Sequence, residues 1–275
     1  MAPGSEPRDV EVLIEGPFER AAVATRLDPA PRASGAELDL RIERRWQELR
    51  AQAQREGREL FDGALLRFVA ARERRDAGGT RRLDLVVGPG GYREFAATNL
   101  DPTLLPADRG GRFPWASFGN ALGTSAIVAT ADGALLLGRR SERVFNYPGW
   151  LHAFGGMLEP DDRSADRAGA AVDPFASVAR ELREELGVAP TELRALTLHA
   201  VIREPCLHQP ALLFLAATSL ARGEVEERWQ AAESRAEHAA LVAFPRQRAA
   251  IERQLATLPR VTPIARACLA FAALG

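Results

Sequence analysis

The segment DPFASVARELREELGV, residues 173–188, constrains the fold more strongly than any other part of this chain. Asp173 suits the N-cap of a helix, Pro174 suits its first turn, and Gly187 lies where a helix-terminating glycine belongs. The apolar residues between them fall on one stripe at about 3.6 residues per turn: Phe175, Val178, Ala179, Leu182 and Leu186. The segment is therefore predicted to be an amphipathic helix with both ends marked.

Three glutamates lie on the adjoining stripe of this helix. Glu181, Glu184 and Glu185 are spaced i, i+3 and i+4, so their carboxylates converge at one edge of the apolar face. Each like-charged pair costs roughly 0.2–0.5 kcal/mol on an isolated helix, and a bound hard cation would remove that cost. Mg²⁺ favours carboxylate oxygens and keeps waters that substrate phosphates can replace. The cluster therefore suits a magnesium site for phosphate chemistry.

A solvated, salt-bridged helix face is the alternative explanation of this charge run. Arg180 and Glu184 form an i,i+4 pair, and similar runs occur elsewhere in the chain. Taken alone, the run is more typical of such a face. Its combination with the Gly155-Gly156 turn and with Gly187-Val188, in fixed order, favours the metal site.

These residues resemble the Nudix box, the signature of hydrolases that act on a nucleoside diphosphate linked to another group. The box reads Gly, five residues, Glu, seven residues, then Arg-Glu-apolar-x-Glu-Glu-x-Gly-apolar. Its second half matches at every specified position: Arg180, Glu181, Leu182, Glu184, Glu185, Gly187 and Val188. The resemblance implies an α/β fold over residues 116–275, an α/β/α Nudix sandwich with a mixed sheet and flanking helices.

The first half of the box departs from the pattern. From Gly156 to Arg180 there are 23 intervening residues, ten more than the pattern has. Regular spacing counted back from the helix puts Val172 at the middle glutamate, whereas Asp162 keeps the expected distance from the glycine. We expect the insertion RSADRAGAAV, residues 163–172, to loop out before the helix, which leaves the middle acidic position open.

Residues from about 85 to 245 look like the UDP-glucose/UDP-galactose diphosphatase branch of this family. The resemblance rests on YREFAATN at residues 92–99, the hairpin around Asp132-Gly133, GRRSERV, the Gly-Gly-x-x-Glu-Pro turn and AEHAALVAF. It implies metal-dependent hydrolysis of a nucleoside diphosphate sugar to a nucleoside monophosphate and a sugar 1-phosphate. Hydrolysis of another nucleoside diphosphate derivative, such as ADP-ribose, and a non-catalytic Nudix-derived ligand sensor are the alternatives.

The family resemblance also implies roles for individual residues. Glu184 and Glu185, joined by the backbone carbonyl of Gly155, would bind Mg²⁺, with Mn²⁺ as the other candidate. Glu181 would be a further ligand or the general base, and Arg180 would orient it. Glu237 resembles a distal acidic position that many Nudix enzymes use as a ligand or base, although a solvated helix-end glutamate explains it equally well.

Substrate-binding candidates lie outside the box. Arg139 and Arg140 end a predicted strand near the expected cleft and suit bidentate phosphate binding, as does Arg203, which precedes Glu204. Tyr92 is a candidate for stacking on the base, with core packing as its alternative, and Phe95 has the same two readings. The four histidines have no metal-ligand spacing and are expected to pack or lie at the surface: His152, His199, His208 and His238.

Residues 1–115 are predicted to form a smaller α+β module that caps or shapes the substrate cleft. Short apolar runs alternate with turn residues, and one helix face carries Leu38, Ile42, Trp46 and Leu49. A stretch with three prolines and two adjacent glycines marks the boundary near residues 100–120.

Composition narrows the range of partners. The net charge is −1 with both signs mixed along the chain, which gives no reason to expect nucleic acid or an anionic membrane as a partner. The first residues lack the pattern of a secretion signal, and Cys206 and Cys268 form no disulfide framework. We therefore expect a cytoplasmic enzyme with a small-molecule nucleotide substrate. The sequence leaves the base, the sugar, the preferred metal and the oligomeric state open.

Overall fold

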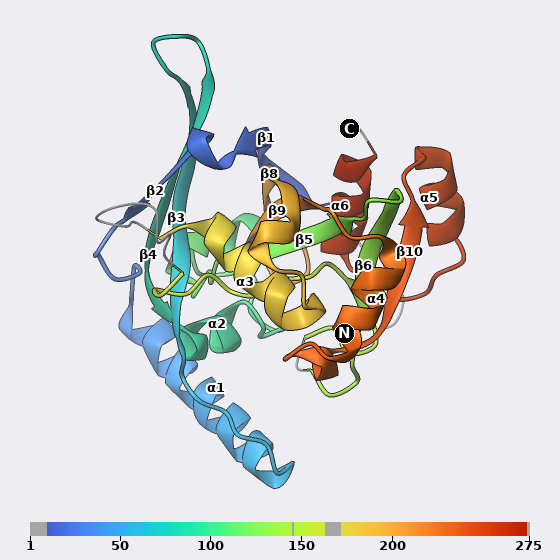
Figure 1. The fold of residues 1–275 in the computed structure, drawn as a ribbon. Helices are drawn as coiled ribbons and strands as arrows, with labels where there is room; N and C mark the ends of the chain where they lie inside the picture. The colour runs from blue at the N-terminus through green and yellow to red at the C-terminus, as the bar shows by residue number, and fades with distance from the viewer. Residues whose placement is uncertain (1–9, 145, 163–171, 274–275) are drawn as a thin grey trace.

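Alternating apolar residues build a mixed β-sheet at the centre of the molecule (Figure 1). The computed structural model describes residues 10–144, 146–162 and 172–273. The strands in these ranges are β1 (Glu11–Glu19), β2 (Val23–Leu27), β3 (Ala64–Arg75), β4 (Arg81–Gly91), β5 (Gly123–Ala129), β6 (Ala134–Arg140), β7 (Leu151–His152), β8 (Leu193–Arg203), β9 (Pro210–Thr218) and β10 (His238–Pro245). The α-helices are α1 (Ala36–Arg55), α2 (Tyr92–Thr98), α3 (Pro174–Leu186), α4 (Arg222–Gln230), α5 (Arg248–Leu255) and α6 (Pro263–Ala272).

The central sheet has the strand order β1-β8-β9-β5-β6-β10, with β7 paired to β6. β5 and β9 run parallel, and the other pairs in this sheet are antiparallel. The Asp132-Gly133 dipeptide forms the predicted hairpin between β5 and β6, where Gly133 has a φ of 89° that favours glycine.

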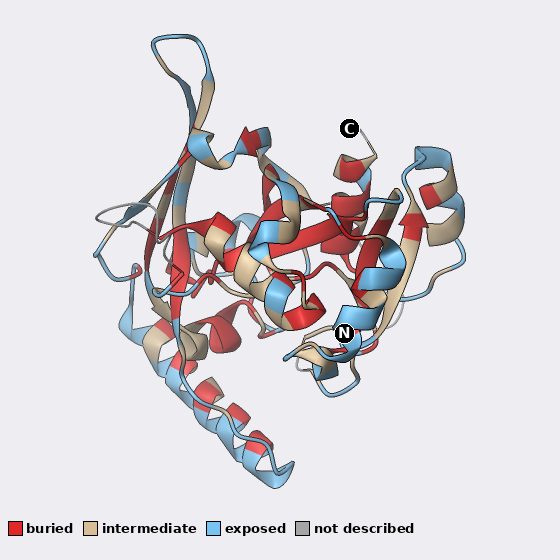
Figure 2. Ribbon diagram, in the orientation of Figure 1, coloured by how far each residue is buried: buried red, intermediate tan, exposed pale blue. Residues whose placement is uncertain are grey.

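Side chains on the two faces of this sheet belong to two separate apolar cores. Val128 packs in the core that includes the buried face of α3, whereas its neighbour Ile127 packs in the core with α5 and α6. Successive residues of a strand point to opposite faces, so one strand serves both layers. Figure 2 shows buried strands between these partly exposed helices. The predicted α/β fold, a Nudix sandwich with a mixed sheet, is confirmed.

The N-terminal part of the chain adds a second sheet with the order β2-β4-β3. Leu83, Leu85 and Val87 of β4 are fully buried and share the core that contains Leu182 of α3. Helix α1 packs on α2 through the predicted apolar stripe, with Leu38 and Ile42 against Ala97. This region is therefore α+β and packs directly on the Nudix core.

The first strand crosses the predicted boundary after residue 115. β1 pairs with β8 from Glu11 opposite Arg203 to Glu19 opposite Thr197, so it belongs to the central sheet and not to the N-terminal one. A run of apolar residues predicts a strand without indicating its partner, because the partner is distant in sequence. For the remaining residues, the division into 1–115 and 116–275 stays a prediction.

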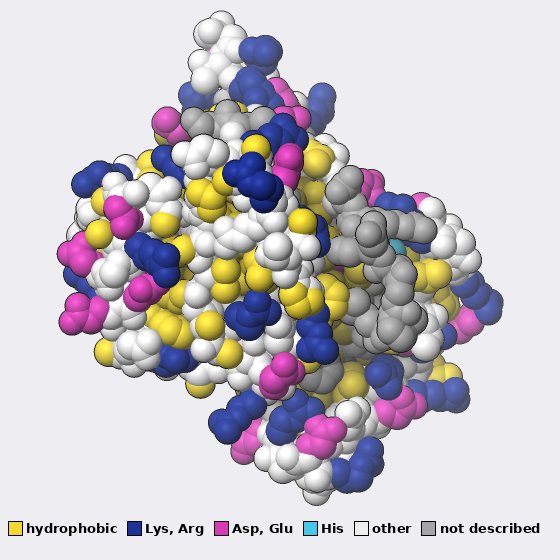
Figure 3. All heavy atoms as spheres, turned by 90° about the vertical axis from the view of Figure 1, so that its right-hand side faces the viewer, with side chains coloured by type: hydrophobic (Ala, Val, Ile, Leu, Met, Phe, Trp, Pro, Cys, Tyr) yellow, Lys and Arg dark blue, Asp and Glu magenta, His cyan; other side chains and the backbone are white. Residues whose placement is uncertain are grey.

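Charged side chains are interspersed on the face of the molecule drawn in Figure 3, where no broad area carries a single sign. Among the described residues, no helix combines the length and the apolar character needed to cross a bilayer. The expectation that nucleic acid is not a partner stays a prediction.

Both predicted ends of α3 are confirmed. The Asp173 side chain accepts a hydrogen bond from the Phe175 N–H at 3.0 Å, and Gly187 has a φ of 69° at the C-terminal end. The buried Asp173 carboxylate also accepts a hydrogen bond from Arg20 Nε at 2.7 Å. One side chain therefore begins the helix and ties it to the N-terminal region.

We predict that Asp173→Ala lowers the free energy of unfolding by about 1–3 kcal/mol, because it removes a helix cap and a charged hydrogen bond together. Urea denaturation measures the change. Asp173→Asn keeps a capping oxygen and loses the charge, so its loss should be smaller and close to that of Arg20→Ala. Equal losses in Asp173→Asn and Asp173→Ala would contradict the capping role.

Candidate active site

The Gly155-Gly156 turn lies directly against two of the box glutamates. Glu185 is buried, and its Oε2 accepts a hydrogen bond from the Gly155 N–H at 3.0 Å. A Cβ on Gly156 would overlap with the Glu181 carboxylate, and one on Gly155 would overlap with the Thr124 carbonyl. Gly155 also has a φ of 138°, which a side chain would strain. Both positions need glycine because the Thr124 carbonyl and the Glu181 carboxylate fill the space that a side chain would occupy.

Burial and mutual repulsion hold these glutamates in an unfavourable electrostatic environment. Burial raises the pKa of Glu181 to about 8, opposed by the charge of Arg180 and reinforced by Glu185, Glu184 and Glu237. Burial also raises the pKa of Glu185 well above its usual range, and the charge of Glu237 reinforces that shift. The two α3 carboxylates and Glu237 therefore approach closely enough to repel one another, and an all-oxygen donor set of this kind fits a hard divalent cation.

Arg180 forms ion pairs with two of the carboxylates that a metal ion would need as ligands. In the described ranges, no three acidic, histidine or cysteine side chains converge as a ready metal cluster. The Arg180 guanidinium pairs with Glu181 at 3.0 Å and with Glu184 at 3.1 Å, and Glu184 also pairs with Arg183 at 3.3 Å. The donor chemistry fits Mg²⁺ or Mn²⁺, but Glu184 must exchange its ion pairs for the cation.

Asp162, one of the two candidates for the middle acidic position of the box, lies beside Arg180. Its buried carboxylate accepts hydrogen bonds from Arg180 Nε at 2.9 Å and from the Glu159 N–H at 2.9 Å. Val172, the other candidate for the position, is buried in the apolar core. The Asp162 carbonyl accepts a hydrogen bond from the Asp173 N–H at 2.8 Å, so the two sides of the insertion meet. The insertion expected to loop out, residues 163–172, lies outside the described residues except for Val172.

Glu237 and Arg140 line a cleft together with the Gly155-Gly156 turn. Glu237 ends the short 3-10 helix η5 (Arg235–Glu237), and its charge acts on both Glu181 and Glu185. Burial lowers the pKa of Arg140, and the charges of Glu185 and Glu237 oppose that shift. Arg140 Nε donates to the Asn146 carbonyl at 2.8 Å, which holds the guanidinium beside these acids.

Three other predicted substrate-binding residues have different surroundings. Arg139 donates to the Gly149 carbonyl at 3.1 Å and is absent from the cleft lining, because neighbouring strand residues alternate in direction. Tyr92 packs edge-on against Trp46 and lines a separate cavity.

Arg203 also lies outside the cleft. It is buried, pairs with Glu11 and Asp108 at 2.6 Å each, and stacks on Trp115. These contacts occupy the guanidinium in joining β1 and the residue 101–113 loop to β8, which corrects the expectation that it faces a substrate phosphate.

His238 packs in the interior, as expected, but it also lies beside a box glutamate, which the sequence did not predict. Its Nε2 lies 3.5 Å from Glu185 Oε2, and its ring lies edge-on to Phe154. Burial lowers its pKa to about 4, assisted by the charge of Arg140, so the imidazole is neutral near pH 7. A side chain on Gly138 would overlap with this ring. The sequence feature that could have indicated this position is that His238 directly follows Glu237.

Tyr147 forms another wall of the cleft that the sequence did not reveal. Its hydroxyl donates to the buried Glu204 carboxylate at 2.8 Å, and its ring stacks on His152. The backbone of Tyr147 has a φ of 51°, which is uncommon for a residue with a side chain. Together with Arg140 and Glu237, these rings enclose a cleft of about 180 Å³.

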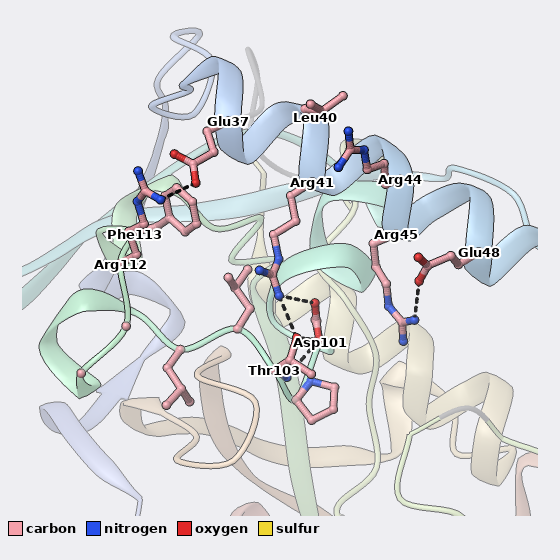
Figure 4. A pocket seen from close by; sticks show the side chains of 15 residues that line it. Glu37, Leu40, Arg41, Arg44, Arg45, Glu48, Asp101, Thr103, Arg112 and Phe113 are labelled. Carbon is pink, nitrogen blue, oxygen red and sulfur yellow. Dashed lines mark hydrogen bonds and ion pairs between the residues drawn. The ribbon is translucent and has the colours of Figure 1, made fainter.

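A larger hollow of about 780 Å³ lies between α1 and residues 101–113, and the box glutamates of α3 do not line it (Figure 4). Arg41 reaches Asp101 and Thr103 there, and Arg112 pairs with Glu37. None of its lining residues belongs to the Nudix box, and much of its positive charge is neutralised by acidic neighbours. The Gly155-Gly156 turn of the box lines the smaller cleft instead.

We predict that Glu181→Gln stabilises the metal-free protein at pH 8. The folded-state pKa of Glu181 is raised from 4.5 to about 8, so the folded state binds a proton more tightly than the unfolded state does. The free energy of unfolding of wild-type protein should therefore fall as pH rises between these values. The variant lacks this loss and should exceed wild type by at least about 1 kcal/mol at pH 8, since one pKa unit equals about 1.4 kcal/mol.

Urea denaturation with a chelator at pH 5 and pH 8 measures this difference. The advantage of Glu181→Gln should be small at pH 5, where wild-type Glu181 is largely protonated in the folded state. Glu226→Gln on exposed α4 is the matched control and should show no pH-dependent advantage. If the variant exceeded wild type in stability by the same amount at pH 5 and pH 8, the pKa of Glu181 would not be raised in the folded protein.

A family model and two curated proteins match this chain. The NUDIX domain model matches residues 119–263. Uridine diphosphate glucose pyrophosphatase NUDT22 of Homo sapiens is 30% identical over 142 residues, 47% of this chain and 47% of that protein. The Mus musculus protein of the same name is 30% identical over 155 residues, 52% of this chain and 46% of that protein. The chain spans about half the length of the curated relatives it matches.

Solved structures with lower identity include DR0079 from Deinococcus radiodurans, which is 15% identical with a TM-score of 0.37 over 54% of this chain and 80% of that one. The MutT protein from Methanosarcina mazei Go1 is 16% identical with a TM-score of 0.35 over 55% of this chain and 91% of that one. The NUDIX domain covers more than half of the chain, and Glu185 of the box accepts a hydrogen bond from Gly155 of the box turn. The protein therefore belongs to the Nudix hydrolase family.

Proposed function

We propose that this protein hydrolyses the diphosphate bond of a nucleoside diphosphate sugar of the UDP-glucose type, giving a nucleoside monophosphate and a sugar 1-phosphate. The observation that carries the proposal is the position of Glu181 and Glu185 against the Gly155-Gly156 turn, which lines the same cleft as Glu237. The names of the two pyrophosphatase relatives support the substrate class.

Nudix hydrolases generally use a divalent metal, and the proposed cofactor here is Mg²⁺, with Mn²⁺ as the other candidate. Glu181, Glu184, Glu185 and the Gly155 carbonyl are the groups that would hold it. When bound, such a cation neutralises charge on the diphosphate oxygens and lowers the pKa of water. Glu184 would leave Arg180 to take part, since the two are paired at 3.1 Å.

The remaining chemistry falls to protein side chains that orient groups and move protons. Glu181 lies against Gly156 and is the proposed acceptor of the proton from the attacking water. Arg180 orients Glu181 and is itself fixed by the buried Asp162. Glu237, on the opposite wall, is the second candidate for the base.

Arg140 is the proposed phosphate-binding residue of the cleft. Its guanidinium is held near the acids by Asn146, and a planar fork of donors suits two oxygens of one phosphoryl group. The neutral His238 ring contacts Glu185 and would position that carboxylate without adding charge. Attack at phosphorus leaves the sugar C1–O bond intact, so the sugar departs with its phosphate.

We predict that Glu184→Gln and Glu185→Gln each lower kcat/KM for UDP-glucose by at least about 100-fold in Mg²⁺. Loss of a group that only supports a metal ligand costs 10–100-fold, so loss of a charged ligand should cost no less. Steady-state kinetics measures the effect, with an added phosphatase that releases inorganic phosphate from the two monoester products but not from UDP-glucose. Glu226→Gln on α4 serves as control and should match wild type, whereas near-normal turnover in both site variants would contradict the assignment.

Product analysis in ¹⁸O-labelled water tests the proposed bond cleavage. UDP-glucose should yield UMP and glucose 1-phosphate, with label in one of the two phosphates and none on the sugar C1 hydroxyl. UDP and free glucose would refute cleavage between the two phosphorus atoms, and label on the glucose C1 hydroxyl would refute attack at phosphorus. If the protein hydrolyses ADP-ribose but no nucleotide sugar, the proposed diphosphate hydrolysis stands and the proposed sugar substrate is wrong.

A further inference from the structure

A second cavity of about 610 Å³ adjoins the catalytic cleft and shares a wall with it. It lies between residues 59–65 of the N-terminal region and residues 157–161 of the Nudix box, with Tyr92 at its side. Met157 lines both the cavity and the cleft, and Gln209 Nε2 donates to its sulfur at 3.1 Å. A substrate spanning the two spaces would pass directly beside Gly155-Gly156.

The lining of this cavity excludes a phosphate group. It carries three carboxylates, Glu59, Glu159 and Asp161, and no arginine or histidine among its described lining residues. The remaining lining is largely apolar and aromatic. Such a site repels an anion but accepts a neutral group that offers N–H or O–H donors and a flat apolar face. One uncharged end of a nucleoside diphosphate sugar meets these requirements.

Phe61 presents its ring at the mouth of this cavity. Its exposed fraction is 77%, the highest among the large exposed apolar residues of the described chain. The ring lies over Gly63, where an added Cβ would stand 3.3 Å from the ring carbon Cε2. An aromatic ring left so open beside a hollow has one face available for stacking.

Hydrogen bonds fix the segment that carries Phe61. The Asp62 side chain accepts from the Arg93 N–H at 2.8 Å, at the start of α2. The Gly63 carbonyl accepts from the Tyr92 N–H at 2.9 Å, so both aromatic residues are held by the same short connection. The backbone beside Phe61 and Tyr92 is therefore preorganised, which lowers the entropy cost of ordering this segment when a planar group binds.

We propose that this cavity is the nucleobase subsite, in which the base stacks on Phe61 beside Tyr92 while the nearby carboxylates accept hydrogen bonds from the base and the ribose hydroxyls. The inference rests on the proposed function and assigns the two ends of the substrate. The base lies on the Phe61 side of Met157, and the sugar 1-phosphate lies on the side of Arg140 and Tyr147. A planar base is favoured over a hexose because the aromatic surface is open and preorganised.

Isothermal titration with the separate products tests this assignment without relying on turnover. Wild type, Phe61→Leu and Phe61→Trp are titrated with UMP, AMP and glucose 1-phosphate in Mg²⁺. Loss of a base–aromatic stack should weaken nucleotide binding in Phe61→Leu by about tenfold. Glucose 1-phosphate affinity should not change, and Phe61→Trp should keep nucleotide binding. Leu40→Ala on α1, another exposed apolar position, is the control and should resemble wild type.

The possible outcomes separate the subsite from the proposed function. Weaker binding of glucose 1-phosphate with unchanged nucleotide binding in Phe61→Leu would place the sugar in this cavity and overturn the proposal. Unchanged affinity for all three compounds would overturn it as well. A preference for AMP over UMP that Phe61→Leu abolishes would support the subsite and reject the uridine substrate. Wild-type protein that binds none of the compounds and hydrolyses no nucleoside diphosphate derivative would overturn both.

Discussion

Burial of the box carboxylates, reinforced by their mutual repulsion, is the constraint around which the site is built. The fold places Glu181 and Glu185 against a backbone turn that leaves no room for a side chain. Isolated charges in such a place would be strongly unfavourable, so a compensating positive charge is required. Arg180 supplies part of it, and it is anchored in turn by the buried Asp162. The α3 caps, the glycine turn and the Asp162 contact all serve to hold this one arrangement.

Local patterns predicted the elements that carry the chemistry. The caps of α3, the spacing of its glutamates, the Gly-Gly turn and the Asp132-Gly133 hairpin each depend on a few adjacent residues. Such features are encoded over one or two helical turns, so a single sequence is enough to locate them. The same holds for the apolar stripe of α1, where Leu38 and Ile42 are buried as expected.

Features that depend on distant partners were not predictable in the same way. The partner of β1 lies more than 170 residues away, as the pairing of Glu19 with Thr197 shows. Asp162 was one of two candidates for the middle acidic position, and its contact with Arg180 depends on how the chain returns after the insertion. Tyr147 lines the cleft and His238 approaches Glu185 because strands and turns far apart in sequence meet there. Arg203 suited a phosphate by residue type, yet its neighbours in space neutralise it.

The pairing of β1 with β8 means that the folding unit and the family domain have different limits. The family match covers residues 119–263, whereas β8 has its outer edge covered by a strand that lies near residue 15. Without that strand, residues 197–203 of β8 would lose their partner and present unpaired N–H and C=O groups. The edge of the hydrolase sheet is therefore formed by a strand of the N-terminal region, a role independent of any contact with substrate.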